Sequence, residues 1–207
     1  LSSLRATLQK LDVSWNHLND NAMRCLGSHW PESLVSLCLC WNHIGSDGAV
    51  HLAAAIRKPS AKCLQALDMR SNPLGDYGVL AICEAAAERV GLLSLGLGET
   101  SMTDKGACSA MPCLRHHPTL TALDLGENNL TDGACEAIAD LVENSTTLTT
   151  LLLRGFLFEP KRITDVGGKL IADSIARSYL KPFQRKAFEL ELDYQQIGCG
   201  TVLQLAK

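Results

Sequence analysis

The sequence has few aromatic residues and no long apolar run. Phe, Trp and Tyr make up 5% of the 207 residues while hydrophobic residues make up 46%, so a packed interior must be built from aliphatic side chains. No apolar run approaches the roughly 20 residues that a membrane-spanning helix needs. The net charge of −3 gives no general attraction to nucleic-acid phosphates or to anionic lipid. We therefore expect no membrane insertion and no nucleic-acid partner.

The nine cysteines lack the CxxC pairs of a structural zinc site. Because their number is odd and their spacing irregular, they do not indicate a disulfide framework, and a reducing, cytoplasmic location accounts for them most simply. Two glycosylation sequons, at 129–131 and 144–146, favour the opposite, an extracytoplasmic protein. The first sequon falls inside the repeat pattern described below, so we favour the cytoplasm.

We expect no metal site and no cofactor. Cys38 and Cys40 project from one face of an expected strand, and His17 and His43 occupy equivalent positions in adjacent units. A Cys/His metal site is the alternative, but the spacing does not support a shared tetrahedron of ligands.

One pattern recurs along the whole chain. A leucine is followed by apolar residues three and five positions later, a polar residue eight positions later and an apolar residue ten positions later. Copies begin at 8, 34, 64, 92, 120, 148 and 187, so the steps are 26, 30, 28, 28, 28 and 39 residues. We interpret residues 1–207 as a single repeat domain of about seven units. One of the clearest copies consists of Leu120, Leu123, Leu125, Asn128 and Leu130.

Each unit combines a strand with a helix. Alternation around Leu123 and Leu125 is typical of a short, half-buried strand, and the polar residue that follows is expected to bond backbone groups that would otherwise be buried unpaired. An Asp then precedes a segment with helical spacing, which we interpret as a helix N-cap. The small residue two positions after each Asp predicts close packing against the neighbouring unit. The Asp positions are Asp20, Asp47, Asp76, Asp104, Asp132 and Asp165.

These units resemble the leucine-rich repeat family, and the 28-residue period with a helix in every unit is similar to its ribonuclease-inhibitor-like class. The resemblance covers residues 8–207. It implies an α/β solenoid, a horseshoe arc with a parallel sheet on the concave side and helices on the convex side, in which each unit needs its neighbours for burial. It also implies that ligands are held by the concave face or by one rim. Neither end carries a polar capping unit, which favours a fragment of a longer chain.

The sixth unit departs from the period. It contains an insertion of five residues between Leu153 and Ile163. Phe156 and Phe158 in this segment either fill the space left by the missing Asn or belong to a partner-binding loop on the rim.

The expected concave face carries eight acidic and three basic side chains, so it is the acidic side of the molecule. Trp15 and Trp41 occupy the same position in adjacent units, which predicts two aromatic rings stacked about 5 Å apart on one rim. Tryptophan is enriched in binding hot spots, although each ring could instead cover its own turn as a local apolar lid. The residues predicted to bind a partner are Trp15, Trp41, Asp12, Asp68, Arg70, Asp124, Glu127, Arg154 and Tyr194.

The sequence contains no Walker loop, GxSxG or HExxH motif, and we identify no catalytic residues. We interpret the chain as a protein-protein interaction module or scaffold that binds a protein partner with a basic surface, without catalysis and without a small-molecule substrate. Three alternatives remain open: a GTPase-activating protein of the Ran type, a ligand-sensing repeat region of a nucleotide-binding innate-immune receptor, and a structural subunit of a large ciliary or ribosomal assembly.

Overall fold

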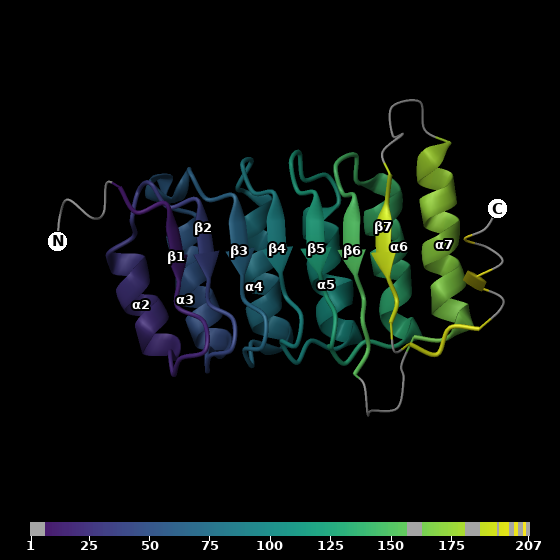
Figure 1. The fold of residues 1–207 in the computed structure, drawn as a ribbon, viewed down its shortest axis with the longest axis horizontal. Helices are drawn as coiled ribbons and strands as arrows, with labels where there is room; N and C mark the ends of the chain where they lie inside the picture. Colours follow the sequence, from purple (N-terminus) through teal and green to yellow (C-terminus); the bar gives the residue numbers. More distant parts are fainter. Residues whose placement is uncertain are drawn as a thin grey trace.

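Strands and helices alternate along the chain in the computed structural model, which describes residues 7–156, 163–180, 187–193, 195–198, 201–202 and 205 (Figure 1). Most of the insertion expected in the sixth unit, including Phe158, lies outside these residues. The strands of the described residues are β1 (Lys10–Asp12), β2 (Ser36–Cys38), β3 (Ala66–Asp68), β4 (Ser94–Gly96), β5 (Ala122–Asp124), β6 (Thr150–Leu152) and β7 (Glu189–Glu191). The helices are α2 (Asp20–Ser28), α3 (Ser46–Ile56), α4 (Gly75–Ala87), α5 (Asp104–Leu114), α6 (Asp132–Asn144) and α7 (Asp165–Tyr179), with a short 3-10 helix η1 (Pro59–Ala61).

The strands form one open parallel sheet in chain order, from β1 to β7. Paired positions step by 26, 30, 28, 28, 28 and 39 residues, the same steps that separate the repeated leucines. Parallel neighbours require a crossover connection, and the helices supply it on a single side of the sheet (Figure 1). The predicted solenoid, with its sheet on one side and its helices on the other, is therefore confirmed. No helix in the described part of the chain has the length and apolarity needed to cross a membrane.

The repeated leucines point toward the helices and form one continuous core. Leu37 and Leu67, which pair across β2 and β3, are both buried there. Small residues allow the helices to pack closely: a Cβ added to Gly78 would lie 3.1 Å from the Cβ of Ala49, closer than side chains normally approach. The close contact predicted from the small residues is therefore present.

Buried asparagines bond the turns of successive units to one another. The side chain of Asn42 donates from Nδ2 to the carbonyl of Leu39 (2.9 Å) and accepts at Oδ1 from the backbone N–H of Leu18 in the preceding unit (3.0 Å). These bonds satisfy backbone groups that would otherwise be buried without a partner, at a cost of about 1 to 3 kcal/mol each. The predicted role of the asparagines is confirmed, and equivalent bonds are made by Asn72 and Asn128.

The Asp at the start of each helix has a different role from the N-cap that we predicted. The N-cap of α6 is Thr131, and Asp132 is the first helical residue. Its Oδ1 accepts from the backbone N–H of Thr164 in the next unit, at 2.8 Å. The local prediction was wrong because the N–H group nearest this carboxylate belongs to the neighbouring repeat. Equivalent bonds to the following unit are made by Asp20, Asp76, Asp104 and Asp165.

Candidate functional site

The third residue after each of the first five strands has a backbone in the left-handed region, which is unfavourable for residues other than glycine. Hydrogen bonds to the next unit hold this conformation: the N–H of Trp15 donates to the carbonyl of Cys40, and the N–H of Trp41 donates to that of Arg70, both at 3.0 Å. Because the turns are equivalent, their side chains line one edge of the sheet face, which we call the rim. The rim residues and their φ angles are Trp15 (57°), Trp41 (56°), Ser71 (55°), Glu99 (53°) and Glu127 (53°).

The first two rim residues form an exposed aromatic stack. The rings of Trp15 and Trp41 are nearly parallel, with centroids 4.2 Å apart and planes inclined by 8°, so the predicted stacking is present. Trp15 remains 71% exposed and Trp41 44% exposed, so the two rings pack on each other and leave large apolar areas in water. His17 and His43 stack beside them with centroids 5.3 Å apart, and the four rings line a groove of about 240 Å³.

The rim becomes acidic beyond Ser71. The hydroxyl of Ser71 donates to a carboxylate oxygen of Glu99, and Glu127 follows in the next unit. A groove of about 220 Å³ runs beside these residues from Trp41 to Arg154. The rim therefore presents an aromatic end and an acidic end, joined by a continuous depression.

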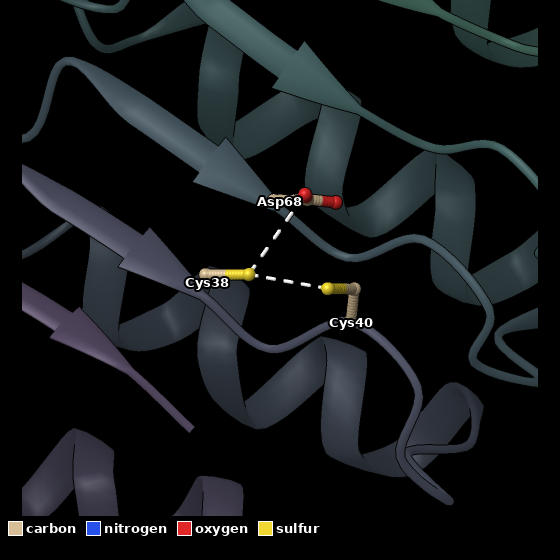
Figure 2. Close-up of side chains that lie close together, drawn as sticks. All are labelled: Cys38, Cys40 and Asp68. Atoms are coloured by element: carbon tan, nitrogen blue, oxygen red, sulfur yellow. Dashed lines mark hydrogen bonds between the residues drawn. The ribbon is translucent and has the colours of Figure 1, made fainter. Parts of the chain in front are cut away.

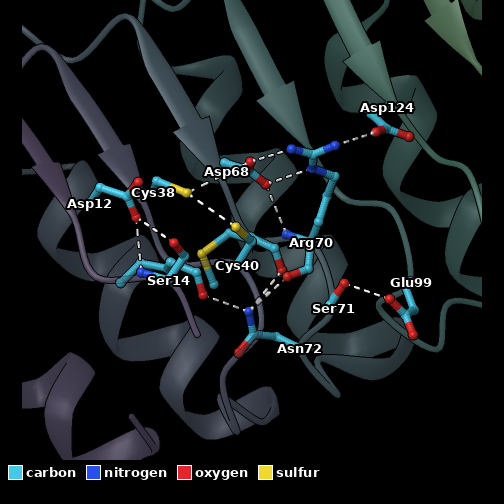
Figure 3. Close-up of polar contacts among 12 residues, drawn as sticks. Asp12, Ser14, Cys38, Cys40, Asp68, Arg70, Ser71, Asn72, Glu99 and Asp124 are labelled. Carbon is cyan, nitrogen blue, oxygen red and sulfur yellow. Dashed lines mark hydrogen bonds and ion pairs between the residues drawn. The ribbon is translucent and has the colours of Figure 1, made fainter. Parts of the chain in front are cut away.

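The floor of the sheet face carries a chain of ion pairs in place of free carboxylates (Figure 3). Arg70 donates from Nη2 and Nε to the two carboxylate oxygens of Asp68, at 2.7 and 3.0 Å, and these hydrogen bonds raise the pKa of the guanidinium. Asp124, whose side chain is 9% exposed, lies 3.5 Å from the guanidinium groups of both Arg70 and Arg154. Arg154 also lies 3.5 Å from Glu191. The structure thus brings four predicted site residues together, as one internal network.

Asp12 is a predicted site residue whose hydrogen bonds lie outside this network. Asp12 on β1 accepts hydrogen bonds from the hydroxyl (2.6 Å) and the backbone N–H (2.9 Å) of Ser14, and these bonds lower the pKa of its carboxyl. Tyr194 lies outside the described residues.

The sequence places Cys38 and Cys40 on one face of a strand but did not indicate that Asp68 lies beside them. The thiols of Cys38 and Cys40 lie 3.2 Å apart, and the Sγ of Cys38 lies 3.9 Å from a carboxylate oxygen of Asp68 (Figure 2). Burial raises the pKa of the Cys38 thiol to about 12. The strand register pairs Cys38 with Asp68, so the 30-residue step between their units was the signal that could have revealed the cluster.

Comparisons with known proteins agree with this architecture. A family model described as Leucine Rich repeat matches residues 6–27, 60–83 and 116–139. The chain is similar to NACHT, LRR and PYD domains-containing protein 5 from Homo sapiens, with 30% identity over 150 residues, which covers 55% of this chain and 12% of that protein. The chain thus matches about an eighth of the length of this curated relative.

Among solved structures, the Leiomodin-1 Actin-Binding Site 2 (ABS2) superposes with a TM-score of 0.50 over 84% of this chain and 82% of that chain, at 14% sequence identity. This likeness concerns the fold alone. The register of the strands, the leucine core and the matches of the family model at three separate repeats all lead to one assignment. Three of its repeats match the leucine-rich repeat model, and the chain has the architecture of a leucine-rich repeat solenoid.

Proposed function

We propose that this chain is a protein-interaction module that binds a partner protein through the rim and the adjoining sheet face, without catalysis of its own. The observation that carries the proposal is the exposed stack of Trp15 and Trp41. Burial of apolar surface contributes roughly 25 cal/mol per Å², and tryptophan is enriched among the residues that dominate binding energy. Because the two rings already hold each other in place, less side-chain freedom is lost when a partner docks.

The chemistry of the rim favours a partner that presents an arginine or a lysine beside an apolar side chain. The apolar group would pack on the indole rings, and the cation would lie over an indole face or reach the carboxylates of Glu99 and Glu127. Asp68 and Asp124 are already paired with arginines, so they contribute less to attraction than an unpaired acidic face would. We therefore expect the basic surface of the partner to consist of a few cationic side chains that face the rim.

We propose a cytoplasmic location for this interaction. All eight cysteines that the structure describes are free thiols, which is the expected state in a reducing compartment.

One alternative function has a specific observation in its favour. Similarity to a human protein named for NACHT, LRR and PYD domains supports a role as the ligand-sensing repeat region of a larger nucleotide-binding chain. Sequencing the complete parent transcript tests this second candidate: an adjoining NACHT domain supports it, and a parent chain without one contradicts it. GTPase activation gains no such support, since the guanidinium of Arg70 is held by two carboxylates.

The primary proposal is tested by capturing partners on the purified chain and on a Trp15→Ala/Trp41→Ala double variant. Tyr77→Ala is the matched control, because Tyr77 is an exposed aromatic residue that belongs to helix α4 and not to the rim. Captured proteins are quantified by mass spectrometry, and the affinity of each recovered partner is measured by calorimetry. We expect the double variant to weaken binding by more than about 2 kcal/mol, roughly 30-fold, and the control to leave it unchanged.

Circular dichroism of both variants ensures that a loss of binding does not reflect a loss of fold. A partner that binds the folded double variant and the unmodified chain with equal affinity contradicts the proposal.

A further inference from the structure

Two thiols and a carboxylate converge on the sheet face where β2 and β3 end (Figure 2). Cys38 Sγ lies 3.2 Å from Cys40 Sγ and 3.9 Å from Asp68 Oδ2, and the donor atoms of all three residues lie within 4.8 Å of one another. The aromatic and acidic rim residues that carry the proposed interaction do not include these three side chains, so the cluster requires an explanation of its own.

The fold explains why these groups meet. Parallel pairing places Cys38 between Asp12 on β1 and Asp68 on β3, so a thiol stands between two carboxylates in one row across the sheet. Side chains alternate along a strand, so Cys40, two residues later, projects toward the same face as Cys38. The strand register and the alternation of side chains therefore set the positions of the three donor atoms.

The separations of these atoms match the coordination of a small tetrahedral ion. Zinc bonds of about 2.3 Å to sulfur and about 2.0 to 2.2 Å to oxygen place neighbouring ligand atoms roughly 3.5 to 3.8 Å apart. The observed distances of 3.2 and 3.9 Å lie on either side of that range, so small side-chain rotations suffice. We propose that Cys38, Cys40 and Asp68 bind a thiophilic divalent cation of the Zn²⁺ class.

The donor set determines which class of ion is bound. Two sulfur ligands favour a borderline or soft ion, whereas Mg²⁺ and Ca²⁺ are bound by oxygen ligands alone. Two thiolates and one carboxylate carry three negative charges, so a divalent cation together with the adjacent Arg70 neutralises the cluster. The guanidinium of Arg70 holds both carboxylate oxygens of Asp68, which makes it a positioning residue that orients the carboxylate toward the thiols.

The site is open to solvent. A groove of about 350 Å³ on the sheet face is lined by Cys38, Asp68 and Arg70, and it gives an ion a path of entry and leaves a coordination position for water. Each thiol must release its proton to the solvent when it becomes a ligand. The charged groups that face the two thiols are Asp12 from β1 and Asp68 and Arg70 from β3 and the turn after it.

The test uses the complete chain, reduced and freed of metal, and titrated first with Co²⁺ and then with Zn²⁺. We expect one equivalent of Co²⁺ to produce the visible absorption of a tetrahedral thiolate site, and one equivalent of Zn²⁺ to remove it. Zinc affinity is then measured by competition with a chelator. Cys38→Ser, Cys40→Ser and Asp68→Asn are each expected to weaken zinc binding by at least about tenfold, and Arg70→Gln by about tenfold.

Cys25→Ser is the matched control, because Cys25 is an exposed thiol on helix α2, and it is expected to leave the cobalt spectrum and the zinc affinity unchanged. Urea unfolding of every variant shows whether the fold is retained. Absence of a tetrahedral cobalt spectrum in the reduced chain overturns the proposal. Retention of full zinc affinity by a folded Cys38→Ser/Cys40→Ser double variant also overturns it, since the ion would then be bound by other residues.

Discussion

The two ends of the rim have the same backbone and opposite chemistry. Trp15 and Trp41 at one end and Glu99 and Glu127 at the other have φ angles between 53° and 57°, and each donates its backbone N–H to the next unit. An indole and a carboxylate thus occupy equivalent positions in one repeated turn. The hydrogen bonds on the inward side of the turn therefore set its conformation, whereas the outward side chain is free to determine what the surface binds.

The largest expected effect on stability comes from removing the buried side chain that bonds the backbone of one turn. Asn72 is 1% exposed, and its side chain bonds the N–H of Ile44 and the carbonyls of Leu39 and Met69. Asn72→Ala leaves these groups buried without a partner, so we expect the free energy of unfolding to fall by about 3 to 5 kcal/mol in urea denaturation. Asn16→Ala, in the exposed first turn, is expected to cost about 1 kcal/mol. Equal losses of unfolding free energy in the two variants would show that the hydrogen bonds of the buried asparagine do not set the conformation of the turn.

A smaller effect is expected where one repeat bonds the next. Asp132 accepts from the N–H (2.8 Å) and the hydroxyl (2.6 Å) of Thr164 and from the N–H of Gly167 (3.1 Å). Asp132→Ala is expected to lower the free energy of unfolding by about 2 kcal/mol, because hydrogen bonds to a charged group contribute more than neutral ones. Glu136→Ala, at an exposed position of the same helix, is the control and should stay within about 0.5 kcal/mol. A loss as small as that of the control would remove the proposed link between repeats.

Exchanging side chains along the rim is expected to change stability very little. Ser71 lies between the aromatic and the acidic ends, and its N–H makes the same bond to the next unit, at 3.0 Å. Ser71→Trp should therefore add a third ring to the stack and change the free energy of unfolding by less than about 1 kcal/mol. Near-ultraviolet circular dichroism detects the additional coupling between rings. Destabilisation well above 1 kcal/mol would mean that the outward residue also shapes the turn.

The smallest perturbation is chemical labelling, which distinguishes buried from exposed thiols without a substitution. Cys25 and Cys108 are exposed, whereas Cys83 and Cys135 are buried. Burial raises the pKa of the Cys135 thiol to about 12 and also raises that of Cys83, so little reactive thiolate is present at neutral pH. We expect iodoacetamide to label only the exposed pair of these four in the native chain and all four in urea, as measured by mass spectrometry. Rapid native labelling of Cys135 would contradict the packing of α6 against its neighbours.

The sheet and the core could be predicted from the sequence because their residues are specified by short, repeated spacings. Leu11 and Leu37 pair across β1 and β2 at the step that separates their copies of the pattern. The role of the asparagines followed from the same spacing, since a polar residue at a buried position requires backbone partners.

Contacts between units were harder to predict, because they depend on side-chain directions in three dimensions. Arg70 and Asp124 are 54 residues apart, and the sequence placed both on one face without indicating that they form an ion pair. The helix-starting Asp was assigned to its own helix, although its bond partner belongs to the next unit. The prediction that Asp68 binds a partner is untested, and the sequence did not indicate its position beside Cys38 or the bonds of Arg70 to both of its carboxylate oxygens.

The measurement that tests the account most directly is hydroxyl-radical footprinting of the chain, free and saturated with a recovered partner, read residue by residue by mass spectrometry. We predict that Trp15 and Trp41 are oxidised in the free chain and protected in the complex, while Tyr77 on the helix side is oxidised equally in both. Protection of Tyr77 with undiminished oxidation of both tryptophans would place the partner on the helices and contradict the proposed function.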